Sequence, residues 1–362
     1  MTLTGDGYHA RFPFSAKGVP FMVRRIDRAL MLNALQEIPY YSDHWRDLPR
    51  ELLFFDPQGI DWERGTIKGL QLRRGVWRRG EFAFPRTIYN RCFPEPRAVL
   101  AKLSEYVGQE SIFNLRTQFD KWEVHGLLTA TEAVDYLPKT YLFAPEELPR
   151  LLTEHTAVIL KPRRGHGGAG VFKVTLAGPE LVVVTSQVFS LPLWGEALYL
   201  PLLAQAVPVG VYLVQEYIES LERGGVKFDV RIVLQKNGEG RWEVSGELSR
   251  VAPARSLLTN GYRAVVPARE VVSREVLDQL HNLGQLVAEG LERGIPGLGE
   301  LGVDFLLDSQ WRPWILEVNG KPDKGLFWKL GDDKMLKRVY LTPLQYQHHL
   351  LHSKTSAPGS FS

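Results

Sequence analysis

The chain has 362 residues, of which 44% are hydrophobic and 23% are charged. This composition excludes wholesale disorder, and at roughly 150 residues per domain the length predicts two or three domains. The net charge of +3, from 44 basic and 41 acidic residues, is too small to indicate a nucleic-acid partner. No apolar run reaches the roughly 20 residues of a membrane span, no secretory signal is recognisable, and the single cysteine, Cys92, predicts a reduced, cytoplasmic location.

The first half of the chain alternates between turns and short regular segments. Glycines between residues 59 and 80 separate strands that we expect over 66–72 and 87–89. From 96 to 128 the spacing of the apolar residues predicts helix. A proline in the first turn indicates a further helix that begins near Ala144.

The second half is predicted to consist of strands around one long helix. Asn237 and Gly238 predict a hairpin turn between two of these strands. Residues 274–292 are typical of an amphipathic helix, and the mostly polar last thirty residues are expected to form a peripheral helix. The expected strands are 157–160, 171–176, 212–218, 230–234, 301–307 and 314–318.

A glycine-rich loop, GHGGAG at residues 165–170, lies between two predicted strands. A dinucleotide-binding loop would open a helix instead, the protein-kinase motifs are absent, and the chain has no Walker A sequence. Lys161 ends the strand before the loop, so its ammonium group could contact phosphate oxygens while backbone N–H groups of the loop cover the others. The alternative is a flexible hairpin with an exposed lysine.

Polar residues on three later strands could hold a phosphate group and a cation. Alternation places Asp229 and Arg231 on one face of a strand, and Glu317 and Asn319 on one face of another. Asp304 lies on an apolar strand, where a charge is costly unless it is paired or bound to a cation. The three oxygen-bearing side chains favour Mg²⁺; the alternative is that Asp304 and Glu317 pair with lysine or arginine.

Taken together, these motifs resemble the ATP-grasp superfamily. Its signature is a lysine before a glycine hairpin, a Gln-Glu-Tyr-Ile hinge, Asp-x-Arg, and then Asp and Glu-x-Asn, in that order. The chain has this order, and its segments FDVRIVLQKNGEGRWEVSG and ILEVNGKP are similar to those of the YheC/YheD endospore coat-associated family. The resemblance runs from about residue 53 to about residue 327.

The resemblance implies an α+β fold of the ATP-grasp type, in which two α+β subdomains enclose ATP and an N-terminal α/β pre-ATP-grasp domain precedes them. The N-terminal domain is expected at 1–110, and the central lid subdomain with the glycine-rich hairpin at 111–210. The C-terminal subdomain, with the hinge and the magnesium site, is expected at 211–335, followed by a helix and tail at 336–362.

The resemblance also assigns roles to individual residues, with ATP and Mg²⁺ as the cofactors. Arg231 and Arg250 would stabilise the transferring phosphate as catalytic residues, and Asp304, Glu317 and Asn319 would hold the metal. The expected ATP-binding residues are Lys121, Lys161, Gly165, Gly167, Gly168, Gly170, Gln215, Glu216, Tyr217, Ile218, Asn260 and, for the ribose, Asp229 or Glu219.

The activity that the resemblance implies is ligation, in which a carboxylate and an amine are joined through an acyl phosphate. Catalysis would depend on positioning and on charge neutralisation. The substrates would be small molecules or peptides. Two other functions stay open: an ATP-binding structural protein associated with the spore coat that has little turnover, and a kinase on the same fold. Lys321 and Lys324 depart from related ligases and could indicate an anionic substrate or be only a feature of the family.

Overall fold

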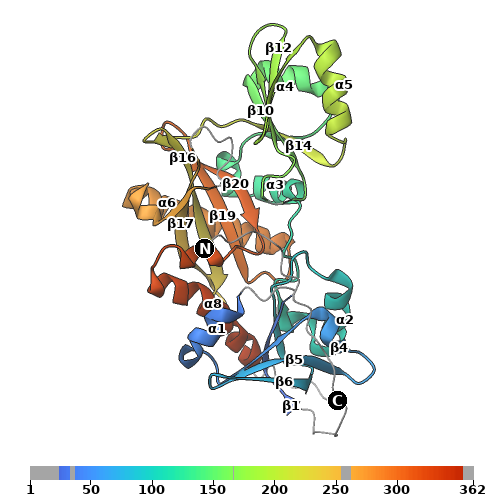
Figure 1. Ribbon diagram of the computed structural model, residues 1–362, viewed down its shortest axis with the longest axis vertical. Coiled ribbons are helices and arrows are strands. Elements are labelled where there is room, and N and C mark those ends of the chain that lie inside the picture. The colour runs from blue at the N-terminus through green and yellow to red at the C-terminus, as the bar shows by residue number, and fades with distance from the viewer. Residues whose placement is uncertain (1–23, 33–36, 166, 254–261, 354–362) are drawn as a thin grey trace, which may run out of the picture.

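The computed structural model describes residues 24–32, 37–165, 167–253 and 262–353. Three β-sheets follow one another along the longest axis of the molecule, and helices cover them (Figure 1). The N-terminal sheet lies at one end, the lid sheet at the other, and the C-terminal sheet lies between them (Figure 1). Within the described ranges, no helix has the length and apolar character needed to span a membrane.

The N-terminal sheet has the strand order β1-β6-β5-β3-β2-β7-β8, with β4 paired to β5. Its centre is parallel, since β2 runs parallel to β3 and β7, and β7 runs parallel to β8. The strands are β1 (Arg24–Arg25), β2 (Arg28–Met31), β3 (Glu51–Phe55), β4 (Ile60–Asp61), β5 (Thr66–Arg73), β6 (Val76–Ala83), β7 (Thr87–Asn90) and β8 (Ile112–Phe113). The helices of this part are α1 (Ile38–Asp43), η1 (Trp45–Asp47), η2 (Pro57–Gly59), α2 (Arg97–Val107) and η3 (Gln109–Ser111).

The region 96–128, predicted as helical, contains two helices with the short strand β8 between them. The first helix, α2, buries its apolar face as predicted but ends at Gly108, whose φ of +86° suits glycine. The second helix, α3 (Lys121–Thr129), begins where the Asp120 carboxylate accepts a hydrogen bond from the Trp122 N–H. The apolar residues of β8 continue the run of hydrophobic positions, which is why the spacing alone did not indicate the break.

The lid sheet is antiparallel and has the order β13-β12-β11-β10-β14-β9. The glycine-rich loop connects β10 to β11, which pair as neighbouring antiparallel strands. Helices α4 and α5 pack their apolar residues against this sheet. The elements are η4 (Glu132–Tyr136), β9 (Thr140–Leu142), η5 (Pro145–Glu147), α4 (Leu148–His155), β10 (Ala157–Pro162), β11 (Phe172–Leu176), β12 (Leu181–Thr185), β13 (Ser190–Trp194), α5 (Glu196–Ala206) and β14 (Tyr212–Glu216).

The C-terminal sheet has the order β18-β17-β16-β19-β20, and β15 pairs with β16. The predicted hairpin joins β16 to β17. The predicted amphipathic helix, α6, buries one face in the core of this sheet. The elements are β15 (Glu222–Arg223), β16 (Val226–Lys236), β17 (Trp242–Val251), β18 (Ala264–Val266), η6 (Ala268–Glu270), α6 (Arg274–Gly294), β19 (Glu300–Leu307), β20 (Pro313–Asn319), α7 (Gly325–Trp328) and α8 (Asp333–Ser353).

The last helix, α8, is central and not peripheral as predicted. Its Tyr340 belongs to a buried cluster that also contains Phe54 of the N-terminal sheet and Leu248 of the C-terminal sheet. The Gln347 amide donates a hydrogen bond to the Ala29 carbonyl of β2 (3.0 Å). The prediction was wrong because the lysine, arginine and histidine residues of α8 lie mainly on one side, while the opposite side is buried.

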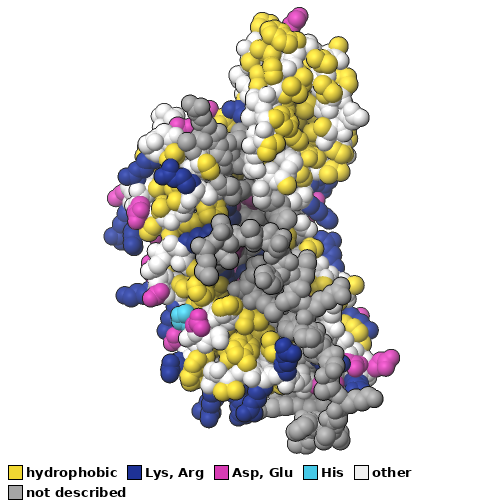
Figure 2. Space-filling view, in the orientation of Figure 1, with side chains coloured by type: hydrophobic (Ala, Val, Ile, Leu, Met, Phe, Trp, Pro, Cys, Tyr) yellow, Lys and Arg dark blue, Asp and Glu magenta, His cyan; other side chains and the backbone are white. Residues whose placement is uncertain are grey.

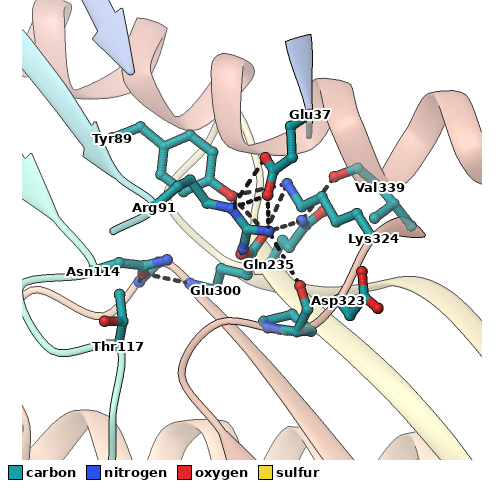
Figure 3. Close-up of polar contacts among 12 residues, drawn as sticks. Glu37, Tyr89, Arg91, Asn114, Thr117, Gln235, Glu300, Asp323, Lys324 and Val339 are labelled. Carbon is teal, nitrogen blue, oxygen red and sulfur yellow. Dashed lines mark hydrogen bonds and ion pairs between the residues drawn. The ribbon is translucent and has the colours of Figure 1, made fainter. Parts of the chain in front are cut away.

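A buried ion network links the N-terminal sheet to the C-terminal sheet (Figure 3). The Arg91 guanidinium, just after β7, forms ion pairs with Glu37 and with Glu300 on β19. The Lys324 ammonium lies 2.9 Å from Glu300 Oε2 and donates to the Tyr89 hydroxyl at 2.8 Å. Burial alone would raise the pKa of Glu300, but Arg91 and Lys324 lower it to about 2. Lys324 is therefore engaged inside the fold, not directed toward a substrate.

Candidate active site

A cleft opens between the lid sheet and the C-terminal sheet. Most of its lining comes from three parts of the chain: β10 with the glycine-rich loop, the hinge after β14, and β19 with β20. Lys121 at the start of α3, Pro138 and Lys227 on β16 complete it. Antiparallel pairing brings β10 beside β14 and β19 beside β20, so residues far apart in the sequence meet here.

The cleft combines apolar walls with a small group of charges. Such walls suit a flat ring, and lysines beside them suit an anionic substituent of that ring. The apolar lining residues are Ile159, Val171, Leu306, Trp314 and Leu316, and the charged ones include Lys121, Lys161 and Glu317.

Lys161 is held in the cleft by its neighbours on three strands. Its ammonium donates to Gln215 Oε1 (2.8 Å) and to the Leu316 carbonyl (3.4 Å). The amide of Gln215 is in turn fixed by donating to the Thr140 hydroxyl (2.9 Å). Burial, reinforced by the nearby charge of Lys121, lowers the pKa of Lys161 from 10.5 to about 8. Lys161 is thus oriented before any ligand binds. Because burial disfavours its charged form, the site favours an anionic ligand that stabilises the ammonium.

Lys121 connects the glycine-rich loop to the C-terminal sheet. Its ammonium lies 3.1 Å from Glu317 Oε1 and donates to the Gly165 carbonyl at 3.2 Å. Its backbone N–H donates to the Arg163 carbonyl (2.9 Å), and the Arg163 guanidinium forms an ion pair with Asp120 (2.9 Å). The start of α3 therefore anchors the loop over the cleft.

The glycine-rich loop needs glycine at several positions. Gly167, Gly168 and Gly170 have φ values of +66°, +73° and +70°, which L-residues with a Cβ rarely adopt. A Cβ on Gly170 would also lie 2.6 Å from the Tyr212 hydroxyl oxygen. Gly165 and Gly168 line the cleft, where a bare backbone can approach a ligand closely.

A β-bulge in β20 brings two consecutive residues into the cleft lining. Asp304 pairs with Glu317 and Phe305 pairs with Ile315, so Leu316 is an extra residue in the ladder. In a regular strand Leu316 and Glu317 would point to opposite faces, whereas a bulge re-aims one of them. Both therefore line the cleft.

Two arginines and two aspartates form a buried chain of ion pairs on the C-terminal sheet. Arg231 Nε lies 2.6 Å from Asp304 Oδ1, and Arg250 Nη2 lies 2.9 Å from Asp304 Oδ2 and 2.5 Å from Asp229 Oδ2. Burial would raise the pKa of Asp304, but the two guanidinium groups hold it below its usual value. Asp229 is therefore directed toward Arg250, and of the two predicted ribose ligands only Glu219 is exposed.

The three predicted metal ligands lie on adjacent strands. Asp304 and Glu317 are opposite each other, and Asn319 Nδ2 lies 3.4 Å from Asp304 Oδ2. Both carboxylates are paired with cations, as the alternative interpretation of the sequence predicted. Across the described ranges, no group of three or more His, Cys, Asp and Glu side chains is arranged for a metal. Two carboxylates and an amide nevertheless fit Mg²⁺, which keeps several waters and bridges phosphates.

All four predicted hinge residues line the cleft. The Glu216 N–H donates to the Lys139 carbonyl (2.9 Å) and the Tyr217 N–H to the Ala157 carbonyl (3.1 Å). These bonds fix the path of the hinge. The neighbouring polar backbone groups of the hinge are the Glu216 carbonyl and the Ile218 N–H.

Two lysines that fix the hinge tyrosine were not predicted from the sequence. Lys173 of the lid lies 3.5 Å from the centroid of the Tyr217 ring, and Lys227 of β16 donates to the Tyr217 hydroxyl (2.9 Å). Lys227 could have been found, because it shares the strand alternation of Asp229. Nothing in the sequence pattern indicated Lys173.

The structure brings part of the predicted set together in the cleft and places the rest elsewhere. The predicted residue Asn260 lies outside the described residues. Those that line the cleft are Lys121, Lys161, Gly165, Gly168, Gln215, Glu216, Tyr217, Ile218 and Glu317, and those that do not are Gly167, Gly170, Glu219, Asp229, Arg231, Arg250, Asp304 and Asn319.

Comparison with known proteins identifies relatives of this chain by sequence. A family described as YheC/D-like ATP-grasp matches residues 109–350. The chain is 27% identical over 297 residues to endospore coat-associated protein YheD of Bacillus subtilis (strain 168). This match covers 75% of this chain and 64% of YheD. It is 27% identical over 316 residues to endospore coat-associated protein YheC of the same strain, covering 78% of this chain and 83% of YheC. The chain thus spans less than two thirds of the length of YheD.

A solved structure has a similar architecture along almost the whole chain. It is D-alanyl-alanine synthetase A from Vibrio cholerae O1 biovar eltor, with a TM-score of 0.53 and 12% sequence identity. The match covers 91% of this chain and 99% of the synthetase. At this identity the similarity concerns the fold alone.

Proposed function

Because this chain belongs to the YheC/D-like ATP-grasp family, we propose that it is an ATP- and Mg²⁺-dependent ligase that joins a carboxylate to an amine. The observation that carries the proposal is the cleft, where Lys121 and Lys161 lie beside Glu317, under a glycine-rich loop. A solved structure of similar fold is a synthetase, which supports ligation as the reaction.

The cleft offers a place for each part of ATP. The adenine ring would lie between the apolar walls, with its polar edge at the Glu216 carbonyl and the Ile218 N–H. The ribose would reach Glu219. Lys121, Lys161 and the backbone N–H groups of the glycine-rich loop would contact the phosphates, because fixed cations and loop amides stabilise a triphosphate.

Asp304, Glu317 and Asn319 would hold Mg²⁺. When bound, the ion would neutralise the charge of the phosphates. Lys121 is the present partner of Glu317, so its ammonium would turn to the phosphates when the carboxylate binds the ion.

The reaction would proceed in two steps. A substrate carboxylate oxygen attacks the γ-phosphorus, the bond to the β–γ bridging oxygen breaks, and ADP and an acyl phosphate form. The amine then attacks the acyl carbon, releases inorganic phosphate and loses a proton. Arg231 and Arg250 would stabilise the negative charge on the transferring phosphate, and Lys161 would hold the phosphates in line with the attacking oxygen.

The test is ADP formation by the purified chain with ATP and Mg²⁺, across pools of amino acids and peptides. A ligase releases ADP and phosphate only when both substrates are present, and mass spectrometry then finds a product lighter by one water than the two substrates. ATP binding without ADP formation in any pool would favour the alternative, a spore coat-associated structural protein, which the names of the two relatives support. A product heavier by one phosphoryl group would identify a kinase.

The domain boundaries and the location follow from the same proposal. We propose an N-terminal domain at 1–110, a lid at 111–210, a C-terminal subdomain at 211–335, and a helix and tail at 336–362. The division into three sheets supports three parts, but β8 of the N-terminal sheet and β14 of the lid sheet extend a few residues past the first two boundaries. We propose a cytoplasmic location, with association with the spore as the role that the relatives suggest.

The affinity for ATP is expected to depend on pH through Lys161. Its pKa is about 8 in the free protein, and a bound triphosphate favours the charged ammonium and so raises that pKa. Below about pH 7 the lysine is already protonated and the affinity should be constant. Above pH 8 binding must take up a proton, so the affinity should fall by up to about tenfold per pH unit.

Calorimetric titration with a non-hydrolysable ATP analogue between about pH 7 and pH 9.5 measures this dependence. The Lys161→Arg variant is the control, because its guanidinium stays charged throughout this range and should give a flat profile. A flat profile in the unmodified chain would contradict the role of Lys161.

A further inference from the structure

The lid carries an apolar surface that the cleft does not use. Between residues 181 and 215, Glu196 is the single charged side chain. Helix α5 buries Tyr199 and Leu203 against the lid core, yet Leu198 and Leu202 face outward. Figure 2 shows hydrophobic side chains covering much of this end of the molecule, with few charged ones among them.

This exposed surface is large for a monomeric protein. Trp194, directly before α5, is 66% exposed. With roughly half of each side chain accessible, on the order of 100 Å² apiece, the eight exposed apolar residues of the lid present about 800 Å² in total. Leu198 and Leu202 lie on the outer side of α5, whereas alternation along β13 directs Trp194 to the sheet face opposite the buried Leu193. The exposed residues are Val188, Phe189, Leu191, Trp194, Leu198, Leu202, Val209 and Val211.

We propose that this surface, centred on the outer side of α5, binds a second copy of the chain. A lipid surface is disfavoured, because interfacial helices carry lysine or arginine beside their apolar face and residues 181–215 contain neither. A charged partner would find no opposite charges to pair with. A neutral apolar face is complementary to itself, and the interfaces of homodimers are the apolar class.

Helix α5 itself suits a two-fold axis. In an antiparallel pair of α5 helices centred near Pro201, the two Glu196 carboxylates lie at opposite ends, about 15 Å apart, so they do not repel each other strongly. Ala197 and Ala204 are exposed beside the two leucines, and such small side chains let two helices approach. The leucines at positions 198 and 202 are one turn apart and therefore form a continuous ridge.

Addition of a strand at the free edge of β13 is the other way in which two lids could join, and Pro192 opposes it. The Gly195 N–H donates to the Glu180 carbonyl toward β12 (2.7 Å). In an antiparallel strand the backbone N–H and C=O groups of successive residues point alternately to the two sides. The backbone groups of position 192 therefore point away from β12, toward the free edge. A proline there offers no N–H to a new strand, so the helix and not the strand edge is the expected contact.

The experiment is light scattering coupled to size exclusion, with the full chain over a range of micromolar concentrations. We expect a dimer for the unmodified chain and a monomer for the Leu198→Glu, Leu202→Glu double variant, whose exposed positions leave the folded core intact by circular dichroism. A matched control, Val76→Glu, alters an equally exposed apolar residue on the N-terminal sheet and should remain dimeric. A monomeric unmodified chain, or a dimer that persists in the double variant, would overturn the proposal.

A cross-link tests the geometry independently of that variant. The native cysteine, Cys92, is buried, so a cysteine introduced by Leu202→Cys reacts alone with a short bis-maleimide. A covalent dimer is expected for Leu202→Cys and none for Val76→Cys. Dimers that cross-link only through Val76→Cys would place the interface elsewhere, and binding of the monomer to neutral phospholipid vesicles would assign the surface to lipid instead.

Discussion

The Lys161→Ala variant is expected to lose ATP-dependent ADP formation by about 10²–10³-fold, the usual effect of removing one pre-oriented group that stabilises developing charge. The ammonium is oriented by Gln215 and the Leu316 carbonyl toward the cleft, and its truncation leaves Lys121, which is paired with Glu317. Because burial lowers the pKa of Lys161, its charge does not stabilise the free protein. The free energy of unfolding should therefore stay unchanged or rise.

The matched control for this variant is Lys102→Ala. Lys102 lies on α2, with its ammonium 4.4 Å from the centroid of the Trp62 ring, and should retain full activity. ADP release and urea unfolding are measured on both variants. Unchanged ADP formation by Lys161→Ala would remove Lys161 from the site, whereas a loss that accompanies unfolding would show a structural role only.

The Arg91→Ala variant is expected to lower the free energy of unfolding by about 3–5 kcal/mol, the range for breaking a buried ion pair. Truncation leaves Glu37 and Glu300 without their shared guanidinium, while Lys324 stays paired with Glu300 (Figure 3). Urea unfolding at neutral pH measures the loss. The effect should exceed that of any exposed pair, because the guanidinium is 1% exposed.

Arg150→Ala provides the comparison for this stability change. Its ion pairs with Glu147 and Glu154 are exposed on α4, so its removal should change the free energy of unfolding by less than about 1 kcal/mol. In the double variant Arg91→Met, Glu300→Gln two opposite charges are removed together, and the loss should be smaller than the sum of the two single losses. A strictly additive result would mean that Arg91 and Glu300 do not depend on each other.

The sequence predicted the fold and the order of the elements well. The ATP-grasp fold and the YheC/D-like family are confirmed. The glycine-rich loop lies between two antiparallel strands, and the hairpin after β16 lies where Asn237 and Gly238 predicted a turn. These features depend on local residues, such as glycines at positive φ, and a local signal can be read from a sequence.

The features that depend on tertiary contacts could not be predicted. Alternation gives no sign of the bulge that brings Leu316 and Glu317 together, because a bulge is a property of two paired strands. Lys324 suggested a substrate contact, yet the structure pairs it with the buried Glu300 on β19, and this pairing depends on how the chain folds after β20. The catalytic and metal roles of Arg231, Asp304 and the other predicted site residues stay predictions.

The position of α8 bears on how the protein is made. Chains are synthesised from the N-terminus at about 5–20 residues per second, and domains that are complete can fold before synthesis ends. Here Tyr340 and Gln347 of the last helix close a core that begins with Ala29 and Phe54. The first sheet to emerge from the ribosome must therefore wait for nearly the whole chain, and it is the part that chaperones would need to protect.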